Sequence, residues 1–321
     1  SAAASNVPTR VQDPAVLLES RRPYGDYCSA TVINEQQLWH PRKKVISYSL
    51  FRLDGAEYQS NRNAKRRNFE SYFQGFRANV EGAALYYPEW VVRVYTFDLS
   101  KEQIESLIQL DERRVEVVVC NSTSPVANKW SNKSVTRLLP YDDPSVYAYV
   151  SRDSDSRFTA RELLAVNQWL ASSDHCFHSM RDHAAHGRPV LCGMFGMKRG
   201  CLEDDYNSDD YDYDYEKDKN DGGNEVSRKL TMTKMLDEEV KRDPTLGSPL
   251  FDQAFLARNV WPKVKGRTMS HDIDKDRCQK LGSATCRDWP LGPANVSAAA
   301  YYVGQSHRVA TEASHGYACT L

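Results

Sequence analysis

The segment YAYVSRDSDSRFTARELLAVNQWL, residues 147–170, decides the fold class of this protein. Its first residues are an apolar run typical of a buried strand, and its last residues have the apolar spacing of a helix. Between them, Thr159 and Glu162 form a helix start signal. Asp153 and Asp155 therefore follow the end of a predicted strand, where they form either an ordinary solvated turn or a site for a metal ion.

The front half of the chain repeats this alternation of strand and helix. Ser100 and Gln103 form a capping box, and the run VEVVVC reads as a strand that is buried on both faces. Repeated strand–helix units predict an α/β fold with a doubly wound, mostly parallel central sheet flanked by helices. Ligands bind such sheets beyond the carboxyl ends of the strands. The predicted strands are 45–50, 90–97, 115–120 and 145–150, and the predicted helices are 63–85 and 100–110.

The back half of the chain is less regular. Residues 203–224, EDDYNSDDYDYDYEKDKNDGGN, form an acidic, tyrosine-rich insert with too little apolar content to pack, so we expect a flexible loop there. Tyrosine sulfation, loose calcium binding and a basic partner are the functional alternatives for this insert. Helices are predicted at 228–242 and 249–260, and the part from Trp261 onward is predicted to be rich in loops and pinned by cysteines.

Length and charge limit the class of protein. The 321 residues suit one large α/β domain or two small ones. We expect a single domain over residues 1–321, with residues 1–40 as an N-terminal extension. The formal net charge of −1 excludes general electrostatic attraction to nucleic acid or to an anionic membrane. No apolar run approaches the length of about 20 residues that a membrane span requires. The first residues, SAAASNVPTR, match neither a signal peptide nor an anchor, so we expect any such segment to lie outside this sequence.

The cysteines and glycosylation signals indicate the compartment. The chain has eight cysteines and no CxxC pair, which argues against a zinc ribbon. An even number at scattered spacing suits disulfides in an oxidising compartment, and it also suits buried thiols. Sequons at Asn121, Asn132 and Asn295 favour the first alternative, so we expect a protein of the Golgi or endoplasmic-reticulum lumen or a secreted one. The pairs close enough in the sequence to close short loops are Cys192 with Cys201 and Cys278 with Cys286, and spacing leaves the connectivity undecided.

The chemistry of a D-x-D sequence depends on the backbone that carries it. On an extended segment, side chains at positions i and i+2 point the same way, so we expect Asp153 and Asp155 to face one site. Hard divalent ions such as Mg²⁺ and Mn²⁺ prefer oxygen ligands and share them with substrate phosphates. The pair therefore suits a metal that clamps a nucleotide diphosphate. The absence of a GxGxxG or Walker sequence argues against a dinucleotide dehydrogenase and a P-loop enzyme.

A series of short motifs occurs in a fixed order over residues 45–275. The chain reads YFQGFRANVEGAALYYPEWVVRVY, then SRDSDSRFTARELLAVNQWL, HSMRDHAAHGRPVLCGMFGMKRG and FDQAFLARNVWPKVKGRTMSHD. This order resembles a family of glycosyltransferases with the nucleotide-diphospho-sugar transferase (GT-A) fold, whose members read Y-x-x-G-x-x-x-N, RD-x-DS, RDH…H, a GG-x-W-G-like turn, DQ-x-FL and a terminal HD. The chain departs from that pattern at the acidic insert and at CGMFG, where Cys192 and Phe195 replace glycine and tryptophan.

The resemblance implies a metal-dependent enzyme that moves a sugar from a nucleotide-diphosphate donor, expected to be UDP-linked, to a hydroxyl of a glycan or glycoconjugate. Asp153, Asp155 and His271 would bind Mn²⁺ or Mg²⁺, which requires the imidazole of His271 to lie near both aspartates. Asp252, with Gln253 beside it, would face the reacting sugar carbon, as general base in an inverting enzyme or as a charge-stabilising group in a retaining one. The residues expected to contact the donor are Ser49, Phe51, Arg152, Arg181, Asp182, His183, Gly193, Gly196 and Lys198.

Structural explanations compete with these roles. Asp252 also suits the first turn of a helix, and Ser49 and Phe51 suit simple sheet packing. His183 and His186 suit a hydrogen-bonded structural cluster as well as a donor contact, with a separate metal pair as the third alternative. For the whole protein, the rival hypotheses are a non-catalytic GT-A-like protein that binds a glycan or a partner, and a nucleotidyltransferase or sugar-nucleotide hydrolase on the same sheet.

Overall fold

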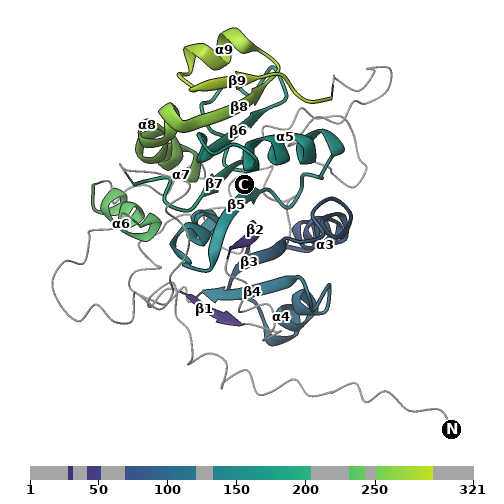
Figure 1. The fold of residues 1–321 in the computed structure, drawn as a ribbon. Coiled ribbons are helices and arrows are strands. Elements are labelled where there is room, and N and C mark those ends of the chain that lie inside the picture. The colour runs from purple at the N-terminus through teal and green to yellow at the C-terminus, as the bar shows by residue number, and fades with distance from the viewer. Residues whose placement is uncertain are drawn as a thin grey trace.

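The computed structural model describes residues 28–31, 42–51, 69–120, 133–203, 231–242 and 251–291. Within these ranges, strands from all parts of the chain form one nine-stranded sheet (Figure 1). The strands are β1 (Cys28–Thr31), β2 (Lys43–Phe51), β3 (Val91–Phe97), β4 (Val115–Cys120), β5 (Val146–Arg152), β6 (Phe177–Arg181), β7 (Met194–Lys198), β8 (Thr268–Asp272) and β9 (Thr285–Arg287). Their order is β1-β4-β3-β2-β5-β7-β6-β8-β9. β1 is antiparallel to β4, β7 is antiparallel to β5 and β6, and the other neighbours are parallel.

Helices cover both faces of this sheet. Figure 1 shows α3, α4 and α5 on one side and α6, α7 and α8 on the other. The helices are α3 (Phe69–Tyr86), α4 (Lys101–Ile108), the 3₁₀ helix η4 (Lys133–Asp142), α5 (Ala160–Leu170), α6 (Met232–Arg242), α7 (Phe251–Phe255), the π-helix η7 (Leu256–Val260), α8 (Trp261–Val264), the 3₁₀ helix η8 (Lys265–Arg267) and α9 (Lys275–Lys280). The prediction of an α/β fold with a mostly parallel, helix-flanked sheet is confirmed.

The alternation of side chains along each strand divides the interior into two cores. Val45 and Tyr149 belong to the core beneath η4, α6, α7 and α8, whereas Ile46 and Val150 belong to the core beneath α3, α4 and α5. Neighbouring residues of a strand point to opposite faces, so a strand that is covered on both sides must be apolar at both. This requirement explains why apolar residues stand at consecutive positions of β2 and β5, such as Val45 with Ile46 and Tyr149 with Val150.

The helix start signals in the sequence form the hydrogen bonds that they predict. The hydroxyl of Ser100 accepts from the amide of Gln103 at 3.3 Å, and the amide of Ser100 donates to the Gln103 side chain at 2.9 Å. Thr159 likewise accepts from the amide of Glu162 at 3.1 Å and begins α5. The helix predicted from residue 63 is described from Phe69 onward.

The C-terminal part is pinned by the Cys278–Cys286 disulfide as predicted, but both ends of the chain contain more regular structure than the sequence predicts. Residues 1–40 are not all an extension, because β1 pairs with β4 and Cys28 forms a disulfide with Cys120. The part from Trp261 onward contains α8, β8, α9 and β9 in addition to its loops, and β6 and β7 were not predicted as strands.

The disulfides follow the predicted chemistry with one change of partner. Cys278 pairs with Cys286 as the spacing allowed, but Cys201 pairs with Cys176 rather than with Cys192, which is itself disulfide-bonded. The disulfides of the described residues indicate an oxidising environment, as outside the cell or in the secretory-pathway lumen. The three sequons and residues 204–224 of the acidic insert lie outside the described residues. No helix in the described ranges has both the length and the apolar character needed to cross a membrane.

The strand order has one switch point that matters for binding. The chain adds β3 and then β4 on one side of β2, and it then crosses over to place β5 on the other side. β2 and β5 are parallel, so their carboxyl ends lie at the same edge of the sheet. In open α/β sheets, the crevice outside such an edge at the switch point is where ligands bind.

Candidate functional site

The 3₁₀ helix η4 lies across the switch point. It packs against β2, β3 and β5, and Ser49 near the end of β2 ties it in place. The Ser49 hydroxyl donates to the carbonyl oxygen of Ser134 at 2.9 Å and accepts from the amide of Arg137 at 3.2 Å. Ser49 therefore acts in this structure as an anchor for η4, which is the packing alternative rather than the predicted donor contact.

Arg137 of η4 joins two of the predicted site residues. One terminal nitrogen of its guanidinium donates to Asp153 Oδ1, and the other donates to Asp252 Oδ2 at 2.6 Å. The hydroxyl of Ser134 donates to the same Asp252 oxygen at 2.8 Å. Burial alone would lower the pKa of Arg137, but Asp153 and Asp252 outweigh it and hold that pKa above its ordinary value. The tertiary fold thus brings Asp153 and Asp252 together around a cation that stays charged.

The segment that follows β5 is a turn and not an extended chain. The amide and the hydroxyl of Ser156 both donate to the carbonyl oxygen of Asp153, at 3.2 and 2.9 Å. The prediction that Asp153 and Asp155 point the same way because they alternate along a strand is therefore wrong. Asp155 lies half-buried within this turn.

Helix α3 packs against the turn that follows β5. The side-chain amide of Asn79 donates to the carbonyl oxygen of Ser154 at 3.2 Å. A Cβ atom on Gly75 would come within 2.4 Å of that same oxygen, so the helix approaches the turn this closely only because residue 75 is glycine. Gly75 and Asn79 belong to the Y-x-x-G-x-x-x-N motif, and their contacts show that these motif residues hold the turn that carries Asp153 and Asp155.

The turn before β7 closes the other side of the site. A Cβ atom on Gly193 would lie 2.1 Å from Asp153 Oδ2, so only glycine leaves room for the carboxylate. Gln253 holds this turn, because its amide donates to the carbonyl oxygen of Val190 and its Oε1 accepts from the amide of Cys192 at 3.3 Å. Both polar atoms of Gln253 are thus used to position the turn that carries Gly193, and its part in catalysis stays a prediction.

Three predicted donor contacts lie elsewhere. Arg152 is buried under the site, where it pairs with Glu162 at 2.9 Å. Gly196 makes room for Trp169, whose ring atom Cζ3 would lie 2.7 Å from a Cβ atom there. Lys198 lies at the far end of β7 from Gly193, and its ammonium donates to the carbonyl oxygen of Ser172 at 2.5 Å beyond the end of α5. These three residues support the fold, and the interpretation of them as donor contacts is corrected.

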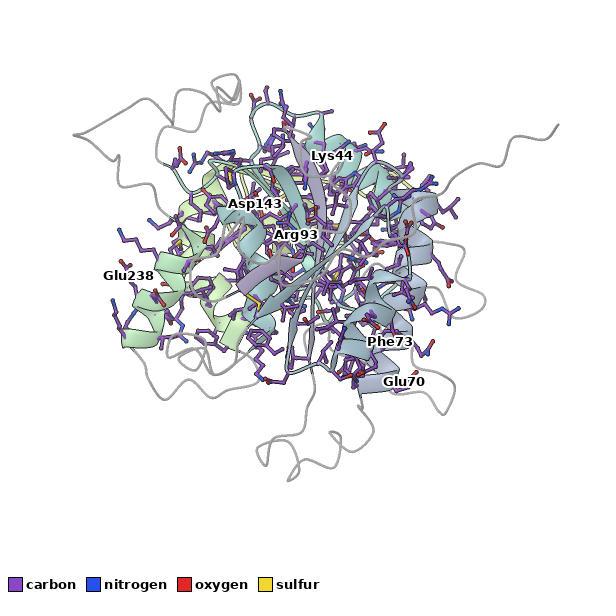
Figure 2. All side chains as sticks on the ribbon, turned by 90° about the horizontal axis from the view of Figure 1, so that it is seen from below. Lys44, Glu70, Phe73, Arg93, Asp143 and Glu238 are labelled. Atoms are coloured by element: carbon purple, nitrogen blue, oxygen red, sulfur yellow. A yellow bond between two sulfur atoms is a disulfide. The ribbon has the colours of Figure 1, made fainter. Side chains whose placement is uncertain are left out.

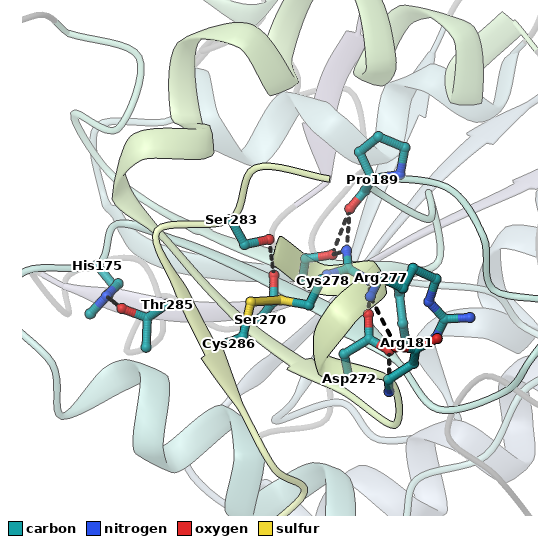
Figure 3. Close-up of a disulfide and its surroundings, with 12 residues drawn as sticks. His175, Arg181, Pro189, Ser270, Asp272, Arg277, Cys278, Ser283, Thr285 and Cys286 are labelled. Atoms are coloured by element: carbon teal, nitrogen blue, oxygen red, sulfur yellow. Dashed lines mark hydrogen bonds and ion pairs between the residues drawn. A yellow bond between two sulfur atoms is a disulfide. The ribbon is translucent and has the colours of Figure 1, made fainter. Parts of the chain in front are cut away.

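The carboxyl end of β6 carries another buried ionic cluster. Arg181 pairs with Asp272 at 2.5 Å and donates to the carbonyl oxygen of Pro189 at 2.5 Å, and Arg277 pairs with the second oxygen of Asp272 (Figure 3). Asp182 pairs with Arg161 at 2.8 Å. Arg181 and Asp182 are therefore held by ion pairs inside the protein, where they join β6, β8, α5 and α9, and their role as donor contacts stays a prediction.

The two histidines after β6 form a local cluster. His186 Nδ1 accepts from the amide of Asp182 at 3.1 Å, and His183 Nδ1 accepts from the amide of Ala185 at 3.1 Å. Burial, with His183 and Arg277 adding to it, lowers the pKa of His186 to about 3. These contacts support the structural alternative for both residues, since each imidazole caps a turn.

His271 does not meet the aspartates. Its Nδ1 bonds to His178 Nε2 at 2.8 Å, and its Nε2 bonds to Gln168 Oε1 at 2.9 Å. Two strands, β7 and β6, separate its strand β8 from β5, which is a displacement of about 14 Å at the usual strand spacing. Among the described residues, no three His, Cys, Asp or Glu side chains form a group suited to a metal ion. We therefore remove His271 from the predicted ligand set.

The remaining oxygen donors suit a hard metal ion whose shell is completed by a substrate. Asp153 Oδ2 accepts no hydrogen bond from the described residues, and the Asp153 side chain is 18 % exposed. Carboxylate oxygens at a partly exposed edge fit Mg²⁺ or Mn²⁺, which commonly take one or two protein carboxylates together with water and phosphate oxygens. Asp153, with Asp155 in the same turn, is the donor set that the structure offers.

Aromatic and charged side chains lie at the carboxyl ends of β2 and β3, beside the start of η4. The rings of Phe51 and Phe97 meet edge to face at 6.5 Å, and the ammonium of Lys133 lies 5.1 Å from the Phe97 centroid. Lys133 also pairs with Asp98, at 2.6 Å. Phe51 is half-buried and packs against Phe97, which suits the sheet-packing alternative, and its part as a nucleotide contact stays a prediction.

Sequence reasoning missed Arg137 and Ser134, the residues that connect the two aspartates. Neither stands in a recognisable motif, and only the chain crossover brings η4 over the edge of the sheet. The candidate site is the group formed by Asp153, Asp155, Arg137, Gly193 and Asp252. Comparison of this chain with protein families, with curated proteins and with solved structures found no match.

Proposed function

We propose that this protein is a metal-dependent glycosyltransferase of the GT-A fold. It moves a sugar from a nucleotide-diphosphate donor, UDP-linked in the first instance, to a hydroxyl of a glycan or glycoconjugate in the lumen of the Golgi or endoplasmic reticulum. The observation that carries the proposal is the position of Asp153, which directly follows β5 at the switch point of the sheet. One of its carboxylate oxygens, Oδ2, accepts no hydrogen bond from the described residues. The order of the sequence motifs supports the same assignment.

Asp153 and Asp155 would hold the metal, Mn²⁺ or Mg²⁺. When bound, this ion supplies Lewis-acid neutralisation of the departing diphosphate. Gly193 keeps the space beside Asp153 Oδ2 free of a side chain, and Gly75 with Asn79 fixes the turn that carries both carboxylates. In this proposal Asp153 and Asp155 supply oxygen donors, and substrate phosphates and water would complete the shell.

Asp252 is better suited to stabilising positive charge than to taking a proton. Its side chain is only 5 % exposed, and its oxygens accept from Arg137, Ser134 and the amide of Gln253. A general base must reach the acceptor hydroxyl within hydrogen-bond distance, and these contacts already use both oxygens. We therefore assign Asp252 an electrostatic role at the sugar carbon.

A thermal-shift screen tests the proposal. Nucleotide diphosphates and their sugars are added with and without Mn²⁺, because a ligand that binds only the native state must raise the melting temperature. We expect one nucleotide to stabilise the protein only when Mn²⁺ is present, and we expect Asp155→Ala to lose this response. Asp288→Ala is the matched control, since Asp288 is exposed and pairs with Lys275 far from the site. A flat response from the native chain to every nucleotide contradicts the proposal.

A glycan- or partner-binding protein without turnover is the second candidate. The observation in its favour is that Arg137 already occupies one oxygen of Asp153 and one of Asp252. Assay of released nucleotide with and without acceptor glycans separates the candidates. Release that depends on acceptor supports the transferase, release without acceptor supports a hydrolase on the same sheet, and binding without release supports the non-catalytic protein.

A further inference from the structure

Arg93, like Arg137, joins two acidic side chains, so the hydrogen bonds of the two clusters can be compared. Arg93 on β3 pairs with Glu116 at 2.7 Å and with Asp143 at 2.8 Å. Figure 2 labels Arg93 and Asp143 among the side chains of the interior. The other Glu116 oxygen pairs with Lys43 at 2.7 Å, and the other Asp143 oxygen accepts from the amide of Ser145 at 2.9 Å. Every carboxylate oxygen of the Arg93 bridge is therefore satisfied inside the protein, and the two acidic side chains are only 6 % and 10 % exposed.

The Arg137 bridge has the same components but is incomplete. Asp252 uses both of its oxygens, whereas Asp153 uses only Oδ1, and its Oδ2 stands at the space that Gly193 leaves. The Nε group of Arg137 is buried and has no hydrogen-bond partner in the described part of the chain. The cluster of Arg137, Asp153 and Asp252 therefore contains one hydrogen-bond acceptor, Asp153 Oδ2, and one donor, Arg137 Nε, that the described residues leave unpaired. Buried polar groups in native proteins are almost always paired, so the unpaired Nε of Arg137 beside the partly exposed carboxylate of Asp153 points to ligands of both charges.

We infer that Arg137 is a built-in counter-ion that a divalent cation must displace from Asp153, and that the diphosphate receives the released guanidinium. The inference rests on the proposed function and goes further, because it explains how metal and nucleotide are made to bind together. Without a diphosphate, an ion at Asp153 would face the positive charge of Arg137. With a diphosphate present, that charge has a new anionic partner, and bidentate arginine–phosphate pairing is favourable.

The inference makes binding of the two ligands cooperative. A nucleotide that draws Arg137 away raises the affinity for the metal, and by linkage the metal raises the affinity for the nucleotide by the same factor. Arg137 is therefore a positioning residue that acts through Asp153. It holds Asp252 with its other nitrogen, so Asp252 remains paired when Asp153 is released.

Mn²⁺ binding provides the test, measured by electron paramagnetic resonance of the free ion with and without the nucleotide diphosphate found in the thermal-shift screen. We expect wild-type protein to bind Mn²⁺ at least tenfold more tightly with the nucleotide than without it. Arg137→Gln removes the competing charge, so Mn²⁺ alone should bind about tenfold more tightly than to wild type. Coulomb's law gives a change of this size for a unit charge and a divalent ion about 5 Å apart, even at the dielectric constant of water. The enhancement by nucleotide should shrink in the same variant.

Three variants control the interpretation. Arg137→Lys keeps the charge and should keep the weak affinity for Mn²⁺ alone. Arg93→Gln breaks the closed bridge of the same kind and should lower stability without changing Mn²⁺ affinity. Asp153→Asn should abolish Mn²⁺ binding. The inference is overturned if wild type binds Mn²⁺ with nucleotide but Arg137→Gln binds Mn²⁺ alone no more tightly than wild type.

A structure of the wild-type protein with Mn²⁺ and nucleotide decides the matter if Arg137→Gln does not fold. The inference requires Arg137 to contact a phosphate oxygen in that complex, and an Arg137 that remains on Asp153 Oδ1 overturns it. If the proposed function is wrong, the result is different, because neither wild type nor any variant then binds Mn²⁺ with any nucleotide. That result removes both proposals together.

Discussion

Asp153 and Asp252, which follow a strand and begin a helix far apart in the chain, are held by a single guanidinium, that of Arg137. The two acids stand in two different motifs of the sequence, and neither motif contains the arginine that joins them. Removal of Arg137 would leave both carboxylates buried or partly buried without their main partner, and loss of one member of such a cluster typically costs about 3–5 kcal/mol. The cluster is therefore both a candidate site and a weak point of the fold.

Gly193→Ala should disable the site. The new Cβ atom would lie 2.1 Å from Asp153 Oδ2, so either the carboxylate or the turn must move. We expect loss of the Mn²⁺-dependent thermal shift and a fall in unfolding free energy of about 1–3 kcal/mol. Gly187→Ala is the control, because a Cβ atom there meets nothing within 4 Å. Equal behaviour of the two variants would contradict the assigned role of Gly193.

Gly75→Ala should displace the turn that carries Asp153 and Asp155. Alanine favours a helix interior over glycine by about 1 kcal/mol, so the substitution would stabilise α3 if no clash occurred. The Cβ atom of the variant would instead meet the carbonyl oxygen of Ser154 at 2.4 Å, whereas that of Gly82→Ala meets only the ring of Phe158 at 3.1 Å. Chemical denaturation should therefore show Gly75→Ala less stable and Gly82→Ala no less stable than wild type.

The histidine pair His178 and His271 should make the protein sensitive to acid. Burial lowers the pKa of both rings, that of His271 to about 4 with help from Arg287 and Arg161. The charged groups that face the pair are all cationic: Lys198, Arg181, Arg287 and Arg161.

The sign of this effect follows from the protons that each state binds. Below about pH 6.5 an unfolded histidine takes up a proton that the folded His271 refuses. The stabilisation is therefore complete above pH 6.5 and is lost as the pH falls towards 4, by about 3 kcal/mol for His271. Denaturation curves between pH 7 and 4 should show this loss, and the loss should be smaller in His271→Gln. Parallel pH profiles for variant and wild type would contradict the explanation.

The disulfides should differ in their effect on stability. Cys28–Cys120 spans 92 residues of sequence and Cys278–Cys286 spans 8. In the chain-entropy model, these loops correspond to about 4.6 and about 2.5 kcal/mol. Replacement of each pair by serine, followed by calorimetry, should show the larger loss for Cys28–Cys120. A larger loss for the short loop would mean that the contacts of α9, such as the pairing of Arg277 with Asp272, depend on its disulfide.

Lys198→Met should separate support of the fold from binding of the donor. Burial lowers the pKa of Lys198 to about 8, and its ammonium satisfies carbonyl oxygens of Leu170 and Ser172 at the end of α5. We expect a loss of about 1–2 kcal/mol in unfolding free energy with an unchanged response to Mn²⁺ and nucleotide. A selective loss of the nucleotide response would restore the original interpretation of Lys198 as a diphosphate contact.

The sequence by itself determined the elements whose signals are local. The apolar runs of β2 and β4, the capping box at Ser100, the N-cap at Thr159 and the position of Asp153 after β5 all depend on neighbouring residues, and all are found as predicted. β6, with the sequence FHSMR, escaped prediction because its polar residues are buried by partners from other elements, such as His271 for His178 and Asp272 for Arg181. No local pattern reveals such partners.

Only the tertiary structure decided which of the predicted site residues meet. The crossover that places β5 beside β2 carries η4 over the same edge, and this brings Arg137 to Asp153 and Asp252. The insertion of β7 and β6 between β5 and β8 removes His271 from that edge, although its motif order suggested otherwise. Motif order is a one-dimensional property, whereas side-chain contact depends on strand order and on the direction in which each chain segment leaves the sheet.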